Sequence, residues 1–402
     1  MIFFPIMHIG TRLALIIGAI LILASLACSA ESGQRIRTLA FGRYWWIPKV
    51  TIDPTLDITY VPACRYDLED REIQRNMRMY MPRTYSGLVE NYDVIYITGA
   101  AGIRNFKLNW LTWFKDSVRK EGLGLLMSGG SEAFGGRADD PSWSPSPVGD
   151  TLPVTFSWVI FDSHFFVRVR VDVVEPEDAL MRSLPWEDAE HGYMNLGVRG
   201  KEGAEVLSFA EIPGRPKRVE PHTVWWEYGE GRSVAFTPST LSSDTKWEYF
   251  PDMLINILIY TYDGSPSPDY EVVHNLRLSL GTYHTARSIA MSLMEFADKM
   301  GASVRAPELT LAKANEKVAE ARQLFLERKM DEAAQTMELA QELLDEAGVR
   351  AVEARNSAMT WVFVIEWLVV TGTFLSSGVI LHSLLIRRRL YRQVAVTRSD
   401  QR

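Results

Sequence analysis

The residues of this chain with the clearest chemical potential lie in one glycine-rich turn. Ser128 and Ser131 supply hydroxyl groups to this turn, and Glu132 supplies a carboxylate. A short apolar run over residues 123–127 precedes the glycine pair 129–130, a pattern typical of a strand that ends at the carboxyl edge of an open α/β sheet. In an enzyme such a turn presents a Cys or Ser nucleophile to a His base. This turn contains no cysteine, so the scaffold is that of an enzyme without the expected thiol.

Serine, metal and nucleotide chemistry find little support elsewhere in the sequence. No histidine stands at a recognisable spacing from Ser128, although a serine nucleophile needs a base. His164, His191 and His222 are dispersed and lack the spacing of metal ligands. Neither a Walker loop nor a GxGxxG turn after a strand is present. The sequence therefore predicts no metal site and no cofactor.

Two stretches carry a resemblance to a known family. The first is GGSEAFG over 129–135 with SPVGDTLPV over 146–154, and the second is WWEYGEGR over 225–232, followed by Trp247 and Phe250. Both are similar to motifs of the glutamine amidotransferase-like domain family, a branch of the class I amidotransferase-like fold, and more distantly of trehalose-utilisation-type proteins. The likeness covers roughly residues 35–263.

The resemblance implies a fold and also a difference in activity. It implies an α/β domain with a flavodoxin-like, class I amidotransferase-like open sheet. Active class I amidotransferases use a Cys at the turn and a His-x-Glu pair, and none of the seven histidines here has a Glu two residues later. We therefore expect a domain that is inactive as an amidotransferase.

Strand-like runs alternate with helix-length segments through the first part of the chain. The strands are expected at 37–42, 56–61, 92–98 and 123–127, and a helix is expected at 106–120. This alternation favours a parallel sheet with helical crossovers. From residue 154 onward short β-rich additions follow, and the apolar run 253–260 reads as a buried helix.

Because the carboxyl ends of parallel strands share one sheet edge, this edge is the expected ligand site. The candidate ligand-binding residues are Trp45, Trp46, Gly99, Ala100, Ser128, Gly129, Gly130, Ser131 and Glu132. One hypothesis is a binding or interaction module, in which the tryptophans stack on a flat ligand such as a sugar or belong to the core. The other is a hydrolase or isomerase acting on envelope carbohydrate, with Glu132 or Asp93 as the acid or base.

Charge and cysteine content narrow the class of protein. The 402 residues carry 43 Lys and Arg against 50 Asp and Glu, a formal charge of −7, which argues against a nucleic-acid partner. Cys28 lies beside an apolar leader, which leaves Cys64 alone in the body of the chain. A single thiol cannot form an internal disulfide, so Cys64 is interpreted as a small buried residue, with a reactive thiol as the alternative.

Two apolar segments predict the location of the protein. Residues 13–27 follow Arg12 and precede small residues, as in a secretory signal; a lipoprotein signal ending at Cys28 and an uncleaved anchor are the alternatives. The apolar segment 361–386 ends at three arginines, 387–389. Its last 20 residues reach ~30 Å as a helix, enough to cross the bilayer. The arginines predict a cytoplasmic C-terminus and an extracytoplasmic main domain in the plasma membrane.

The remaining segment, 264–357, has helical periodicity. Apolar residues at three- and four-residue spacing over 311–325 and 333–344 predict a helical hairpin near the membrane. The expected organisation is therefore a leader or anchor (1–30), an α/β domain (31–263), a helical region (264–357), a transmembrane helix (358–386) and a basic tail (387–402). The expected partners are the lipid bilayer and a carbohydrate or an envelope protein.

Overall fold

The computed structural model describes residues 35–43, 46–135, 141–156, 169–189, 191, 194–212, 218–240, 247–262 and 264–399. The predicted leader and Trp45 lie outside these residues. The described chain divides into two compact units. One contains residues up to 280 together with 320–334, and the other contains 281–319 and residues from 335 onward.

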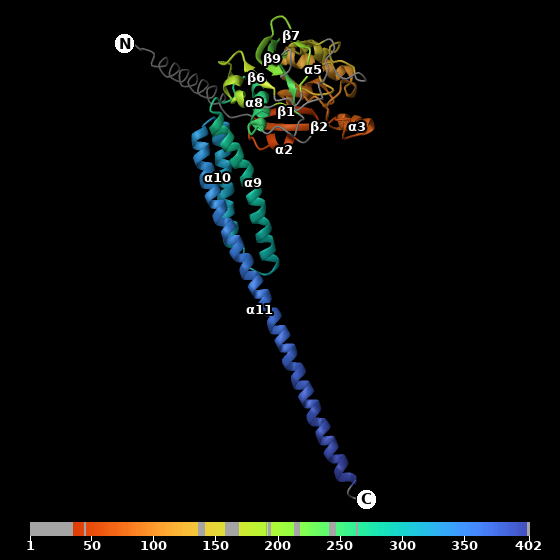
Figure 1. Cartoon of the computed structure of the whole chain (residues 1–402), viewed down its shortest axis with the longest axis vertical. Coiled ribbons are helices and arrows are strands. Elements are labelled where there is room, and N and C mark those ends of the chain that lie inside the picture. The colour runs from red at the N-terminus through yellow and green to blue at the C-terminus, as the bar shows by residue number, and fades with distance from the viewer. Residues whose placement is uncertain are drawn as a thin grey trace, which may run out of the picture. The chain divides into compact units, whose positions relative to one another are not determined.

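The first unit is built on an eight-stranded mixed sheet (Figure 1), in the order β2-β1-β3-β4-β10-β9-β8-β6. The strands are β1 (Ile36–Gly42), β2 (Leu56–Pro62), β3 (Val94–Ile97), β4 (Gly124–Gly129), β6 (Arg170–Val173), β8 (Glu205–Ile212), β9 (Arg218–Tyr228) and β10 (Gly231–Ser239). Strands β2, β1, β3, β4 and β10 are parallel neighbours, and β10, β9, β8 and β6 pair antiparallel. A separate antiparallel pair joins β5 (Val154–Phe156) to β7 (Val198–Gly200).

The four strands expected at the start of the chain are confirmed within a few residues. The expected parallel sheet is confirmed for five strands, while the remaining three extend it in the antiparallel sense. The predicted helix at 106–120 is α5 (Leu108–Glu121), and Gly122 ends it in the left-handed conformation with φ 79°. Glycine adopts this conformation without the steric penalty of a Cβ atom. The predicted buried helix at 253–260 is α8 (Phe250–Tyr262).

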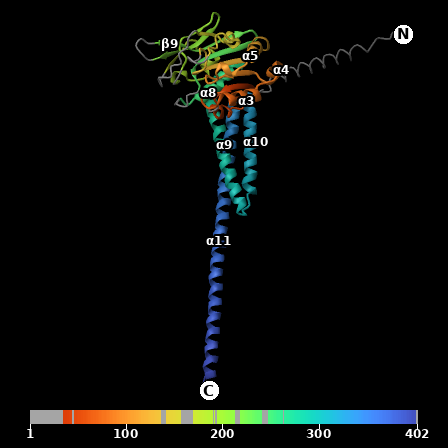
Figure 2. The ribbon, with the colours of Figure 1, turned by 90° about the vertical axis from the view of Figure 1, so that its right-hand side faces the viewer.

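Helices cover both faces of the parallel part of the sheet (Figure 2). The helical segments of this region are α2 (Ile47–Val50), α3 (Asp70–Tyr80), α4 (Tyr85–Asn91), η2 (Ile103–Asn105), α5, α6 (Pro147–Thr151), α7 (Ala179–Arg182), η3 (Trp186–Asp188) and α8. Side chains of β3 alternate between the two cores: Ile95 and Ile97 pack with α3 and α5, and Val94 and Tyr96 pack with α8. Strands buried on both faces explain why these runs are apolar throughout.

The second unit consists of parts of three long helices, α9 (Tyr270–Lys299), α10 (Arg305–Leu326) and α11 (Met330–Ser399). The predicted hairpin of α10 and α11 is present, with α9 as a third helix beside it. Tyr283 on α9 donates a hydrogen bond to Asn315 on α10 (3.0 Å), and Arg350 on α11 donates to Thr310 on α10 (2.9 Å).

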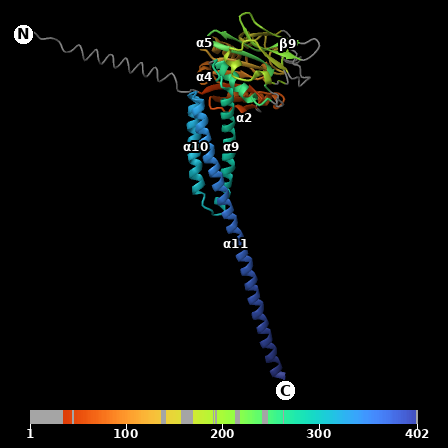
Figure 3. The ribbon, with the colours of Figure 1, turned by 60° about the vertical axis from the view of Figure 1, so that its left-hand side comes forward.

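The second helix of the hairpin and the apolar segment form one continuous helix. Helix α11 runs without interruption through Gly348 and past the loop that joins α9 to α10 (Figure 3). Among the described residues, α11 contains the one helical stretch long and apolar enough to cross a membrane, with mean hydropathy 1.8. Its large apolar side chains from Trp361 to Ile386 are exposed. One glycine costs a helix only about 1 kcal/mol, which flanking residues readily offset.

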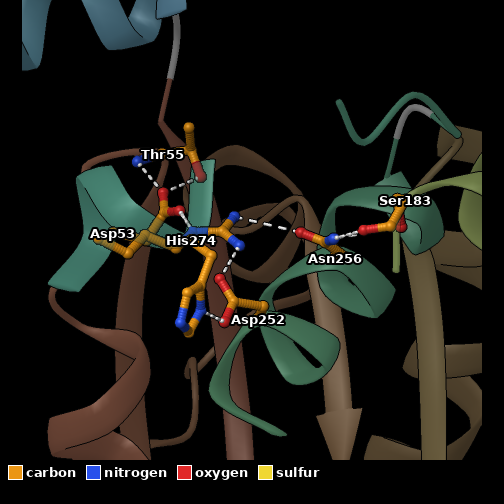
Figure 4. Close-up of polar contacts among 7 residues, drawn as sticks. Asp53, Thr55, Ser183, Asp252, Asn256 and His274 are labelled. Atoms are coloured by element: carbon orange, nitrogen blue, oxygen red, sulfur yellow. Dashed lines mark hydrogen bonds and ion pairs between the residues drawn. The ribbon is translucent and has the colours of Figure 1, made fainter. Parts of the chain in front are cut away.

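A buried ion network attaches the first turns of α9 to the α/β unit (Figure 4). The Arg277 guanidinium pairs with Asp53 (2.6 Å) and with Asp252 on α8 (2.7 Å), and donates to Asn256 (3.1 Å). His274 Nδ1 lies 2.8 Å from the second oxygen of Asp252. Burial alone would lower the Arg277 pKa, but the two carboxylates outweigh it and raise that pKa. One guanidinium therefore compensates two buried carboxylates.

We predict that Arg277→Met destabilises the α/β unit by about 3–5 kcal/mol, because removing one partner of a buried ion pair leaves uncompensated charge. The melting temperature followed by tryptophan fluorescence should fall by roughly 10 °C. Lys299→Met breaks the exposed Lys299–Glu295 pair (2.7 Å) and should leave the melting temperature unchanged. Equal melting temperatures for both variants would contradict this account of the network.

Candidate functional site

The carboxyl edge of the parallel strands is built from backbone in close contact. Gly99 follows β3, and Gly129 and Gly130 end and follow β4. A Cβ atom at Gly99 would overlap the Gly129 carbonyl, and one at Gly129 would overlap the Thr237 carbonyl of β10. A Cβ atom at Gly130 would lie 2.6 Å from the Cα of Gly99, and φ at Gly130 is +154°. No side chain fits at either residue of the glycine pair.

An asparagine that the sequence analysis did not single out locks this turn. The Gly130 N–H donates to Asn195 Oδ1 (2.7 Å), and Asn195 Nδ2 donates back to the Gly130 carbonyl (3.2 Å). The Asn195 N–H donates to the Thr237 carbonyl (3.0 Å), so the clamp also reaches β10. Asn195 is 65 residues from the turn, and no sequence spacing could have indicated this pairing.

Ser128 is not a nucleophile exposed at this edge. Its hydroxyl is buried and lies 3.1 Å from the Tyr96 hydroxyl and 3.0 Å from Thr240 Oγ1, while Tyr96 and Thr240 are 2.8 Å apart. Burial raises the Tyr96 pKa to about 12, so this triangle of hydroxyls stays neutral. The strands beside β4 end at Ile97 and at Ser239, and neither provides a histidine base at its end.

Glu132 is held in an ion pair directly after the turn. Its carboxylate is 1% exposed and lies 2.5 Å from Arg65 Nε, on the segment that follows β2. The Tyr66 hydroxyl donates to Ser131 Oγ (3.2 Å), and the Tyr66 side chain is 53% exposed. The edge thus brings Ser131 and Glu132 together with Arg65 and Tyr66, two residues that the sequence analysis did not name.

The expected role of Asp93 beside this edge is wrong. Asp93 precedes β3, pairs with the Arg37 guanidinium (2.6 Å) and accepts from the Arg37 N–H (2.8 Å). It therefore lies at the amino edge of the sheet, opposite the edge that carries Glu132. Two carboxylates at opposite edges cannot flank one scissile bond.

The remaining candidates are buried. Trp46 is fully buried and packs edge-on against Tyr96, with ring centroids 5.2 Å apart. Ala100 is also fully buried. Cys64 forms a backbone bridge to Ala101 near this edge, but its thiol is buried, and desolvation raises its pKa to about 11. A thiol with that pKa is protonated at neutral pH and is not a substitute nucleophile.

The structure brings together two histidines that looked unrelated in the sequence. The rings of His191 and His222 lie 4.9 Å apart, fully buried among Trp186, Phe236 and Trp247. His222 Nδ1 lies 2.9 Å from the hydroxyls of Ser208 and Thr223, whereas both ring nitrogens of His191 lack a hydrogen-bond partner. Burial lowers the His191 pKa to about 3 and the His222 pKa well below its usual value.

His164 lies outside the described residues. Within the described ranges, no group of three or more His, Cys, Asp or Glu side chains is arranged to hold a metal ion. What the carboxyl edge offers chemically is an exposed phenol, a hydroxyl and a compensated ion pair. These groups can bind a polar ligand, and the described residues of this edge supply no nucleophile with a base.

Comparisons with known proteins agree with this fold. Residues 82–262 match the model of a family described as "Putative glutamine amidotransferase". Two proteins of Salmonella typhimurium, each described as cytoplasmic, are similar solved structures. The first is 18% identical with a TM-score of 0.45, and the match covers 56% of this chain and 99% of that chain. The second, from strain LT2, is 20% identical with a TM-score of 0.45, and the match covers 57% of this chain and 100% of that chain.

A β-galactosidase from the Antarctic haloarchaeon Halorubrum lacusprofundi is 13% identical with a TM-score of 0.36. That match covers 57% of this chain and 30% of the galactosidase chain. No curated protein matches the chain.

Because the backbone at the glycine turn is crowded, one added methyl group there should strongly destabilise the α/β unit. Gly129→Ala should destabilise the α/β unit by about 3 kcal/mol or more, because its Cβ meets the rigid Thr237 carbonyl. Gly200→Ala is the matched control: its Cβ would meet only Val206 and Val224 side chains at 3.5 and 3.8 Å. Thermal melting should separate the two variants, and a Gly129→Ala protein as stable as the control would contradict the crowding.

The buried histidine pair predicts an acid-dependent loss of stability. Both histidines are neutral in the folded protein, whereas the unfolded chain takes up protons below about pH 6.5. Stability should therefore be fully present above that pH and fall by about 1.4 kcal/mol per pH unit for each histidine toward pH 4. The free energy of unfolding is measured by denaturation at pH 7.5, 6 and 5. In His191→Phe its dependence on pH should be smaller by the contribution of one histidine. The exposed His284→Gln should not change it, and an unchanged slope in His191→Phe would refute the assignment.

Proposed function

Residues 82–262 of this chain match the model of the family described as "Putative glutamine amidotransferase", and from this match we propose that the protein is a membrane-anchored, non-catalytic relative of that family. Its α/β domain binds a carbohydrate or an envelope protein at the carboxyl edge of the sheet. The glycine turn carries this proposal. In an amidotransferase the turn holds the cysteine nucleophile, and here neither Gly129 nor Gly130 has space for a Cβ atom.

The groups around the turn support binding rather than covalent catalysis. The Arg65 guanidinium lies 2.5 Å from the buried Glu132 carboxylate, so this carboxylate already has a partner within the protein. Tyr66 presents an exposed ring, and Arg43 beside it is 43% exposed in a two-point pair with Asp67 (2.8 Å each). An exposed ring beside hydrogen-bonding groups suits a sugar or a polar peptide.

The direct test is ammonia release from glutamine by the purified full-length protein. We expect no turnover above the uncatalysed rate, because the thiol that would attack the amide is missing. A known glutaminase assayed in the same detergent controls for inhibition by that detergent. Robust turnover that disappears in Ser128→Ala or Ser131→Ala would overturn the proposal and identify the nucleophile.

A screen of envelope glycans on the same protein separates binding from the alternative, a carbohydrate hydrolase or isomerase. Binding should weaken about tenfold in Tyr66→Ala, since a buried aromatic contact is worth roughly 1–2 kcal/mol. Tyr80→Ala, which removes a 43% exposed ring on α3, is the control. Product formation that is lost in Glu132→Gln would favour the enzyme.

We further propose that the α/β domain lies outside the cytoplasmic membrane and that residues 387–402 lie inside. The apolar part of α11 supports a span, and the three arginines at 387–389 support the orientation through the positive-inside rule. External protease on spheroplasts should remove the α/β domain and spare a tag placed after Arg402. Protection of the domain with loss of the tag would reverse the orientation.

A further inference from the structure

The helical unit has an apolar groove that its own core does not use. The groove lies between α9 and α11 and has a volume of about 890 Å³. Its lining includes Ile289, Leu293 and Phe296 on α9, with Arg355 and Met359 on α11. Met359 is two residues before Trp361, where the exposed apolar stretch of α11 begins. The groove is therefore immediately next to the membrane-crossing part of the same helix.

The core of the helical unit follows heptad spacing, as in a coiled coil. Its buried residues on α11 are Met337, Ala340, Leu344, Ala347, Ala351 and Ala358, and on α9 they include Ala290, Met294 and Ala297. A second apolar series at the end of α9 has the same four- and three-residue spacing but is not buried. It consists of Ile289, Leu293 and Phe296 on α9 and of Met300 directly after the helix; Ile289 is 58% and Met300 45% exposed.

The α11 side of the groove continues into the apolar stretch. At 100° per residue, Glu366, Thr373 and Ser377 lie within 40° of Met359 around the helix. The Thr373 hydroxyl donates a hydrogen bond to the Val369 carbonyl of the same helix (2.7 Å), so this small side chain needs no polar partner from another helix. Small residues four apart let membrane helices approach closely. The groove and this face form one continuous strip for a helix that runs parallel to α11.

We propose that the occupant of this strip is α11 of a second copy of this chain, which makes the protein a parallel dimer. A parallel helix must leave the same membrane at the same height and continue without a break beside the groove. Helix α11 is uninterrupted from Met330 to Ser399 and has both properties. Two copies anchored in one membrane meet in the same orientation, so a two-fold axis along the membrane normal places each groove opposite the other.

The position of Glu366 predicts how a substitution there changes the fraction of dimer. On a two-fold axis through the strip, the two Glu366 carboxylates approach each other at the edge of the span. Like charges there oppose association, so Glu366→Gln should raise the dimer fraction at least twofold. A partner helix with a basic residue would give no such rise in self-association. The proposal rests on the membrane span alone and does not depend on what the α/β domain binds.

Cysteine cross-linking of the full-length protein in its membrane tests the dimer. Met359→Cys and Ser357→Cys each introduce a thiol on α11, and of the two positions only 359 lines the groove. At 100° per residue, residue 357 lies about 160° from residue 359 around the helix and faces away from the two-fold axis. Cys28 is replaced by serine, and Cys64 is buried. We expect a disulfide-linked dimer for Met359→Cys and none for Ser357→Cys. Adding Leu293→Asn should reduce the Met359→Cys product severalfold, whereas adding Leu309→Asn should not.

Several results would overturn the dimer. They are equal cross-linking at residues 359 and 357, a cross-link from residue 359 to a different protein only, or no fall with Leu293→Asn in a protein whose helicity is unchanged. Recovery of the chain in the supernatant after an alkaline carbonate wash would show that α11 does not span the membrane, and the proposal would then be wrong. None of these results bears on ammonia release, so the proposed function stands or falls separately.

Discussion

The contact between backbones at the carboxyl edge of the sheet is the constraint on which the α/β unit depends. Gly99, Gly129 and the Thr237 carbonyl approach so closely that three neighbouring strand ends are fixed relative to one another. The Asn195 amide accepts from the Gly130 N–H and donates to the Gly130 carbonyl; an unpaired buried N–H would cost about 1–3 kcal/mol. The same close approach of the backbones leaves no space for a side chain at Gly129 or Gly130.

This constraint also explains why the polar residues around the turn have structural partners. Glu132 follows directly on a turn whose position is fixed, and Arg65 compensates its buried charge. Ser128 faces the opposite side of β4 and joins two other hydroxyls in the core. The exposed groups at the outer layer of this edge are the Tyr66 ring and the Arg43 guanidinium.

Two buried polar clusters of this unit differ in whether their groups have partners. Arg277 pairs with two carboxylates, so the buried charges of that cluster compensate one another. His191 has no hydrogen-bond partner, and remains neutral because the surrounding aromatic rings exclude water. The buried histidines make the stability of the unit sensitive to acid.

Local sequence by itself determined the elements whose signal is periodic or compositional. The strands around Leu39, Ile95 and Leu125, the glycine that ends α5, and the apolar stretch of α11 follow from hydrophobic period and glycine placement, which act over a few residues. Tertiary structure alone decided which residues meet across long separations. Asn195 reaches the turn at residue 130, Arg65 reaches Glu132, His191 stacks on His222, and Asp93 falls at the wrong edge for catalysis. These outcomes depend on strand order and on burial, and neither is encoded in the spacing of residues along the chain.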